Sequence, residues 1–199
     1  MAKEISNEEN FRALRSGLVC LPQPRSFRSS NYWAEADMDI VDRLLAHDTW
    51  TTRQLLLACQ PLPDSHLDRE FDIDHRSLRA TFIHMIDNIE VWTDLLHERP
   101  VVRKAGSSIP ELLDRLGRAS REFANLARKI VREGRFDDCF LDTLDKPPRL
   151  KTFGGTIGHV ITHNMHHRAH IMWLMERVGI KEHLEGDLLG WEAISSGWE

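Results

Sequence analysis

Cysteine is scarce in this 199-residue sequence, and the three that occur are far apart. Cys20, Cys59 and Cys139 form neither a zinc-ribbon spacing nor a disulfide framework, which needs an even number of partners. Scattered, unpaired cysteines are typical of a reducing compartment. The first ten residues are polar and lack the apolar central region of a secretory signal. We therefore expect a cytoplasmic protein.

Long hydrophobic runs and an excess of basic charge are also missing. No apolar run approaches the roughly 18 residues that suggest a membrane-spanning helix, so we expect no membrane segment. The 26 Lys and Arg residues against 31 Asp and Glu give a net charge of −5. Because nucleic-acid-binding proteins carry a basic surface, this balance argues against nucleic acid as a partner.

Four long stretches with helical periodicity are present, and no alternating strand pattern accompanies them. They cover residues 31–59, 77–98, 109–133 and 153–178, and each ends close to a proline or a glycine. Four long amphipathic helices predict an all-α fold, a four-helix bundle.

The bundle does not account for the whole chain. We divide the sequence into an N-terminal extension (1–30), the bundle (31–179) and a C-terminal tail (180–199). The extension holds at most one short helix. The tail contains Trp191 and Trp198, so we expect it to pack on the bundle or on a second subunit. Residues 135–152 are predicted to be a long connection.

Histidine is unusually frequent, with 11 residues in total. Five of them fall in the fourth helical stretch: His159, His163, His166, His167 and His170. On a helical wheel, His163 and His167 point into the bundle and the other three lie on its shoulder. The i, i+4 spacing of His163 and His167 places these two imidazoles one turn apart on one face, where two ring nitrogens can reach one metal ion.

A third ligand must come from another helix. His84, in the second stretch, faces the interior or its boundary. A single inward histidine is more often part of ordinary core packing, but His84 together with the inward pair His163 and His167 favours a metal site. In the first stretch, Asp48 lies within an apolar arc and His47 lies at its rim. A buried carboxylate needs a partner, so Asp48 is a candidate to accept a hydrogen bond from a ligating imidazole. The four histidines in loops or at helix ends are given no role: His66, His75, His97 and His183.

Three imidazoles would form a neutral ligand set with coordination positions left open for other molecules. A divalent ion in such a site keeps its charge and lowers the pKa of bound water or of a bound thiol. Zinc, nickel, iron, cobalt and manganese all remain possible, because imidazole suits several of them.

Three segments carry a family resemblance: residues 45–56 (LAHDTWTTRQLL), 77–84 (SLRATFIH) and 158–170 (GHVITHNMHHRAH). With them the sequence resembles the DinB-like (DinB/YfiT) superfamily of four-helix-bundle metalloenzymes. The resemblance implies up-down-down-up connectivity with residues 135–152 as a crossover, and a homodimer. It also implies a divalent ion held by His84, His163 and His167. Characterised relatives include thiol transferases that use mycothiol, bacillithiol or glutathione, and a thiol-dependent maleylpyruvate isomerase. Family members often carry Gln where this chain has His170.

Three functions follow as hypotheses, and the first two take a small-molecule substrate. The first is a metal-dependent thiol S-transferase with a low-molecular-weight thiol as co-substrate, in which His47, Asp48 or His166 moves protons. The second is a metal-dependent hydrolase of an amide or ester, with Asp48 or Asp87 as the base. The third is a non-enzymatic, metal-stabilised bundle that binds a small molecule or a partner.

A second apolar stripe on the fourth helix predicts a homodimer interface: Met165, Met172 and Trp173.

Overall fold

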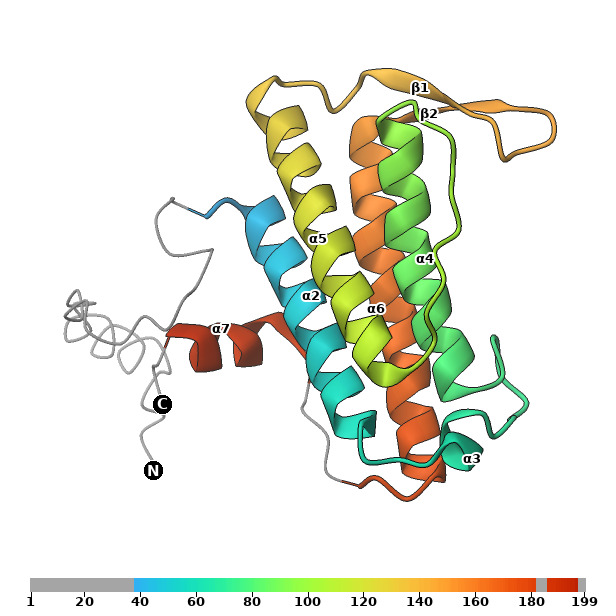
Figure 1. Ribbon diagram of the computed structural model, residues 1–199. Coiled ribbons are helices and arrows are strands. Elements are labelled where there is room, and N and C mark those ends of the chain that lie inside the picture. The colour runs from blue at the N-terminus through green and yellow to red at the C-terminus, as the bar shows by residue number, and fades with distance from the viewer. Residues whose placement is uncertain (1–37, 182–185, 197–199) are drawn as a thin grey trace, which may run out of the picture. The chain divides into compact units, whose positions relative to one another are not determined.

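The computed structural model describes residues 38–181 and 186–196, so the predicted extension over residues 1–30 lies outside the described residues. Four long helices pack together and confirm the predicted all-α bundle (Figure 1). The elements are α2 (Ile40–Cys59), α3 (Asp64–Leu67), α4 (Leu78–Leu96), α5 (Ile109–Arg132), β1 (Cys139–Asp142), β2 (Arg149–Thr152), α6 (Phe153–Arg177) and α7 (Leu188–Ser196).

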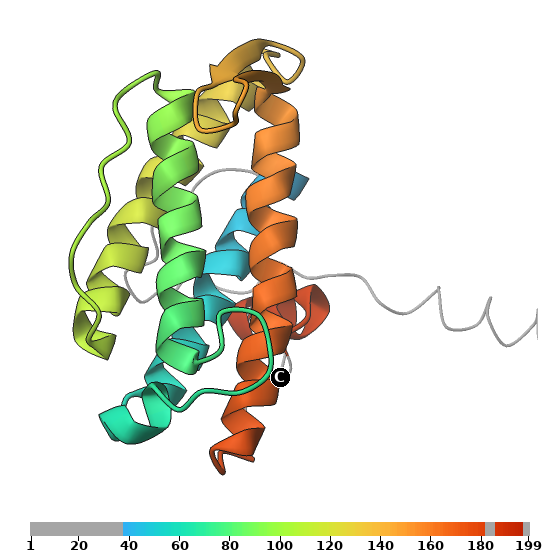
Figure 2. The ribbon, with the colours of Figure 1, turned by 90° about the vertical axis from the view of Figure 1, so that its right-hand side faces the viewer.

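The four long helices form a ring in which α2 contacts α5 and α6, and α4 also contacts α5 and α6. Helices α2 and α6 run in one direction and α4 and α5 in the other, which is the expected up-down-down-up order (Figures 1 and 2). Because α4 and α5 are parallel, the crossover along the length of the bundle is the connection 97–108 (Figure 1). The prediction of a lengthwise crossover at 135–152 was wrong. That connection crosses one end of the bundle instead, and it contains an antiparallel hairpin of β1 and β2.

The predicted start of the first helix at residue 31 was wrong, because α2 begins at Ile40 after its N-cap Asp39. The starts of the other three helices agree closely with the prediction. Ser77, Ser108 and Thr152 cap α4, α5 and α6, and each side chain accepts a backbone N–H from three residues further on. Such caps satisfy donors that a helix start leaves unpaired. Gly154 at the start of α6 allows a close approach, since a Cβ there would lie 3.0 Å from Phe136 Cδ1.

The core between the helices is mainly apolar, and a buried charged cluster lies between α4 and α5. Phe82 and Phe123 are among its largest fully buried side chains. Arg115 Nη2 donates to Glu90 Oε2 at 2.7 Å and to Asp87 Oδ1 at 2.5 Å. These contacts fix α5 against the face of α4 that carries Asp87. Among the described helices, none is both long and apolar enough to cross a membrane.

The second apolar stripe of α6 is partly covered within the chain. The Phe71 ring packs edge-on against Trp173 at 5.9 Å between centroids, and the Arg177 guanidinium lies 4.6 Å from the centre of the same indole. Met165 remains 55% exposed. A homodimer through this stripe therefore stays a prediction.

Candidate metal centre

The three histidines predicted as ligands meet between α4 and α6. His84 lies in the second turn of α4, and His163 and His167 lie one turn apart near the middle of α6. His84 Nε2 is 2.8 Å from His163 Nε2, and His163 Nε2 is 3.1 Å from His167 Nε2. His167 is only 1% exposed, whereas the other two rings are half-buried. The structure therefore brings the predicted triad together around His163.

These separations suit a shared metal ion. Neighbouring ring nitrogens bound to one ion at about 2.0–2.1 Å lie about 2.8–3.4 Å from one another in octahedral or tetrahedral geometry. The observed 2.8 and 3.1 Å, for two of the three pairs, lie within that range. The donor set thus fits a divalent ion that favours imidazole, as zinc, nickel, cobalt and iron do.

Burial keeps the triad in the form that binds metal. Burial and the neighbouring His75 and His163 lower the pKa of His84 from 6.5 to about 4. Burial and the neighbouring His163 lower the pKa of His167 to about 3, and burial also lowers the pKa of His163. Because a metal competes with protons for imidazole nitrogens, rings that are neutral at pH 7 are ready to coordinate.

The same shifts predict how acid affects the metal-free protein. Since the folded chain keeps His84 and His167 neutral well below 6.5, the unfolded chain binds more protons between about pH 6.5 and pH 4. Stability then falls as the pH drops through this window. Thermal unfolding of chelator-treated protein should show a lower midpoint at pH 5.5 than at pH 7. In His84→Gln the decrease should be smaller, and an equal decrease in this variant would contradict the assignment.

His47 faces the C-terminal segment and not the triad. Its Nε2–H donates to the Gly186 carbonyl at 2.7 Å, and its ring lies edge-on to Trp191 at 6.2 Å between centroids. A Cβ at Gly186 would come within 2.9 Å of Thr51 Cγ2, so only glycine allows this approach to α2. Burial lowers the pKa of His47. These contacts, with an ion pair between Arg43 and Glu192, hold α7 on α2.

Asp48 is buried opposite α6 and binds two side chains of that helix. Its carboxylate forms an ion pair with Arg168, and Asn164 Nδ2 donates to Asp48 Oδ2 at 3.1 Å. Asn164 and Arg168 each follow a triad histidine by one residue. Asp48 therefore orients the turns of α6 that carry the triad. The prediction that Asp48 accepts a hydrogen bond from a ligating imidazole was wrong, because Arg168 and Asn164 occupy its carboxylate. An Asn and an Arg at i, i+4 spacing in an apolar helix face could have indicated these partners.

The three shoulder histidines surround the triad as the helical wheel predicted. His166 is exposed, with its ring centre 5.2 Å from that of His167 and 4.4 Å from that of His170. His159 stacks on His163 at 4.9 Å. His166, His167 and His170 also hold ring nitrogens within 4.8 Å of one another. A solvent-exposed imidazole, His166, therefore lies directly beside the buried cluster.

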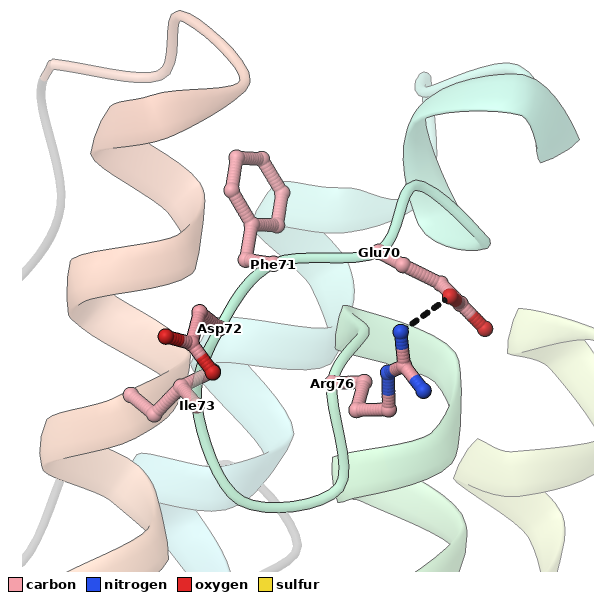
Figure 3. A pocket seen from close by; sticks show the side chains of 5 residues that line it. All are labelled: Glu70, Phe71, Asp72, Ile73 and Arg76. Atoms are coloured by element: carbon pink, nitrogen blue, oxygen red, sulfur yellow. Dashed lines mark ion pairs between the residues drawn. The ribbon is translucent and has the colours of Figure 1, made fainter.

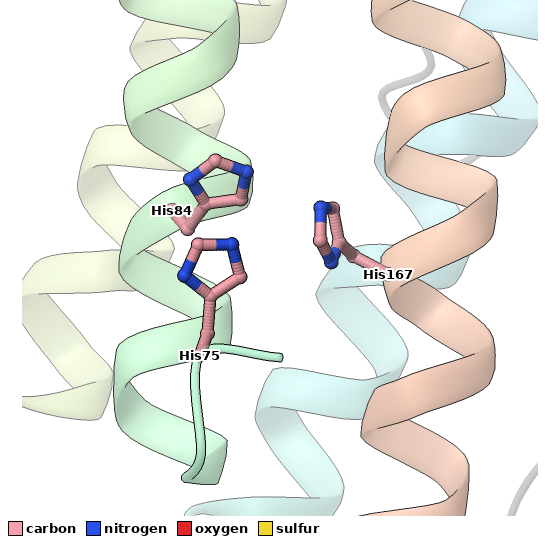
Figure 4. Close-up of side chains that lie close together, drawn as sticks. All are labelled: His75, His84 and His167. Atoms are coloured by element: carbon pink, nitrogen blue, oxygen red, sulfur yellow. The ribbon is translucent and has the colours of Figure 1, made fainter. Parts of the chain in front are cut away.

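One histidine that sequence reasoning left without a role belongs to the cluster. His75, in the loop before α4, stacks on His84 with ring centres 3.7 Å apart and lies 5.0 Å from His167 (Figure 4). Ring nitrogens of His75, His84 and His167 lie within 4.8 Å of one another. Helical periodicity does not extend into a loop, so the sequence offered no signal for its position.

The same loop encloses an open hollow of about 460 Å³ (Figure 3). Glu70, Phe71, Asp72, Ile73 and Arg76 line it. Arg76 Nη2 and Glu70 Oε2 form an exposed ion pair at 2.8 Å across it. The hollow therefore combines two apolar side chains with charges of both signs, one residue away from His75.

The family comparison agrees with this geometry. The model of the DinB superfamily matches residues 47–171, which include His84, His163 and His167. No curated protein matches the chain. The family model covers more than half of the 199 residues. The chain belongs to the DinB superfamily.

Proposed function

We propose that this protein is a divalent-metal-dependent thiol S-transferase that conjugates a low-molecular-weight thiol to a small electrophile. The observation that carries the proposal is the convergence of His84, His163 and His167 into a neutral, all-imidazole set. The family membership supports a metal at this position. A site of this kind suits a sulfur nucleophile, because no catalytic carboxylate is needed to generate a thiolate.

The carboxylates that a hydrolase would need as a base are engaged elsewhere. Asp48 is held by Arg168 and Asn164, and Asp87 pairs with Arg115 and with Arg103 at 3.1 Å. Slight burial raises the pKa of Asp74, but the charge and the backbone N–H of His75 lower it by more than burial raises it. The net shift of the Asp74 pKa is therefore downward. A carboxylate with a lowered pKa is a weak general base at neutral pH. The charge arrangement therefore favours thiol transfer over hydrolysis.

Each group in the site has a separate task in the proposed reaction. When bound, a divalent ion supplies the positive charge that lowers the pKa of a thiol beside it. The triad would hold that ion, and burial of His167 keeps water away from one side. We assign the thiol proton to His166, which passes it to solvent while the sulfur bonds to the electrophilic carbon and the leaving group departs with its electron pair. Asp48 orients α6, and His47 anchors the C-terminal segment.

A turnover assay tests this function. Protein without a polyhistidine tag, loaded in turn with zinc, nickel, cobalt, iron or manganese, is mixed with mycothiol, bacillithiol or glutathione and an alkylating electrophile. We expect conjugation that requires metal and is lost in His163→Ala, whereas His97→Ala, which removes an exposed histidine at the end of α4, keeps full activity.

The other functional hypotheses predict different outcomes of the same experiment. Absence of conjugation with every thiol and every metal would refute the transferase. Turnover of model esters or amides by the loaded protein would then favour a hydrolase. A metal-dependent rise in the thermal midpoint with no turnover would favour a structural metal.

A further inference from the structure

The loop between α3 and α4 passes across the lower halves of α4 and α6 (Figure 2), and it places His75 against His84. Two contacts in its first half hold it to α4 and α6. Phe71 packs on Trp173 of α6, and Arg79 of α4 donates through Nε to Asp68 at 2.6 Å. Hydrogen bonds within the loop, from Phe71 N to Arg76 O at 2.8 Å and from Arg76 N to Ile73 O at 3.0 Å, define its shape. His75 lies at the tip of this built turn.

The backbone at the tip adopts a conformation that ordinary residues avoid. His75 and Arg76 have φ of 57° and 61°, in the left-handed region, although neither is glycine. Such strained residues persist where the surrounding structure holds them, and they concentrate at functional sites. Here the strain turns the imidazole of His75 back towards the bundle, onto the face of His84 (Figure 4). The left-handed turn thus places the His75 ring in contact with the triad.

Ring nitrogens of His75, His84 and His167 lie close together. His75 and His84 lie nearly parallel, 24° between ring planes, with His167 across from them (Figure 4). One nitrogen from each of the three rings lies within 4.8 Å of the other two, close to the largest separation, about 4.2 Å, of two ligands bound to one ion at about 2.0–2.1 Å. The carboxylate of Asp74 is 3.6 Å from His75 Nε2 and adds negative charge beside the cluster.

We propose that His75 is a fourth, loop-borne ligand of the ion held by His84, His163 and His167, so that metal binding fastens the loop over the site. The inference rests on the metal centre of the proposed function. Four imidazoles fill a tetrahedral zinc site, whereas they leave two positions on a six-coordinate ion. The loop thus determines which metals leave room for a thiol and where a substrate enters, beside the hollow lined by Phe71 and Ile73.

Cobalt binding to the full-length, tag-free chain tests the proposal. The variants are His75→Asn, since Asn tolerates left-handed φ, and His75→Phe, which keeps a ring to stack on His84. Both should weaken Co²⁺ binding at least by the roughly 10- to 100-fold that loss of an outer-sphere partner costs, and both should change the visible spectrum of bound Co²⁺. Amide exchange of residues 68–77 should slow on Co²⁺ addition in the wild type and change little in the variants. His66→Ala, an exposed histidine of α3, should behave as wild type.

The outcomes separate this inference from the metal centre itself. Wild-type affinity and spectrum in both His75 variants, with binding lost in His163→Ala, would overturn the fourth ligand and leave the triad standing. A normal His75→Phe beside a weakened His75→Asn would mean that His75 acts by stacking, which also overturns it. If the wild type binds no Co²⁺, the triad and the fourth ligand fail together.

Discussion

Replacing His163 with alanine is expected to abolish stoichiometric metal binding and to leave the bundle folded. Its Nε2 is the one nitrogen close to both other triad nitrogens, at 2.8 Å from His84 and 3.1 Å from His167. Without it, the other two triad rings come from different helices and lose the nitrogen that links them, and the loop-borne His75 replaces neither of the two close contacts. The ring is half-buried and outside the apolar core, so its removal creates only a small cavity. Elemental analysis of tag-free protein should give about one ion per chain for the wild type and none for the variant.

A matched control comes from the same helix. His159 lies one turn before His163 and stacks on its ring, but its nitrogens are outside the triad. His159→Ala should therefore retain the full metal content. Far-ultraviolet circular dichroism should show unchanged helix content in both variants. Metal content of His163→Ala equal to that of the wild type would eliminate the triad as the binding site.

The contrast between His84 and His75 shows what periodicity can predict. Within a helix, the 3.6-residue repeat fixes which side chains share a face. The wheel therefore predicted that His163 and His167 meet a histidine of the second helix. His75 is nine residues before His84, but a turn with two left-handed residues separates them. The helical repeat carries no information about such a turn, so only the structure shows that a His75 nitrogen lies near the triad.

Asp48 shows a second limit. Its place in an apolar arc predicted burial and a need for a partner, and both are observed. The predicted partner, a ligating imidazole, was wrong, because Arg168 and Asn164 hold the carboxylate. Arg168 was not expected, since it is 120 residues away and an arginine in a helix is usually solvent-exposed. The strands β1 and β2 were not predicted, because each has only four residues. This length is too short for an alternating pattern to be recognised.

Replacing Asp48 with alanine should cause the largest loss of stability of any single change considered. Arg168 is 3% exposed and Asn164 fully buried, so both would lose their partner where water does not reach. Leaving one charge of a buried ion pair without its counterpart costs about 3–5 kcal/mol of the free energy of unfolding. For a chain of this size that corresponds to a thermal midpoint lower by about 6–20 °C. Differential scanning calorimetry of metal-free protein measures it without interference from metal binding.

Two further variants distinguish a buried-charge effect from a general sensitivity to lost ion pairs. Glu133→Gln removes one partner of an exposed pair, 41% exposed on both sides, and should cost at most about 1 kcal/mol. The double variant Asp48→Leu with Arg168→Met removes both charges and should be more stable than Asp48→Ala, because apolar groups can replace a buried pair at little cost. If the double variant is as unstable as Asp48→Ala, the unpaired guanidinium is not the cause. The loss would then come from Asn164, whose amide donates to Asp48 Oδ2 at 3.1 Å and which both variants leave without that acceptor.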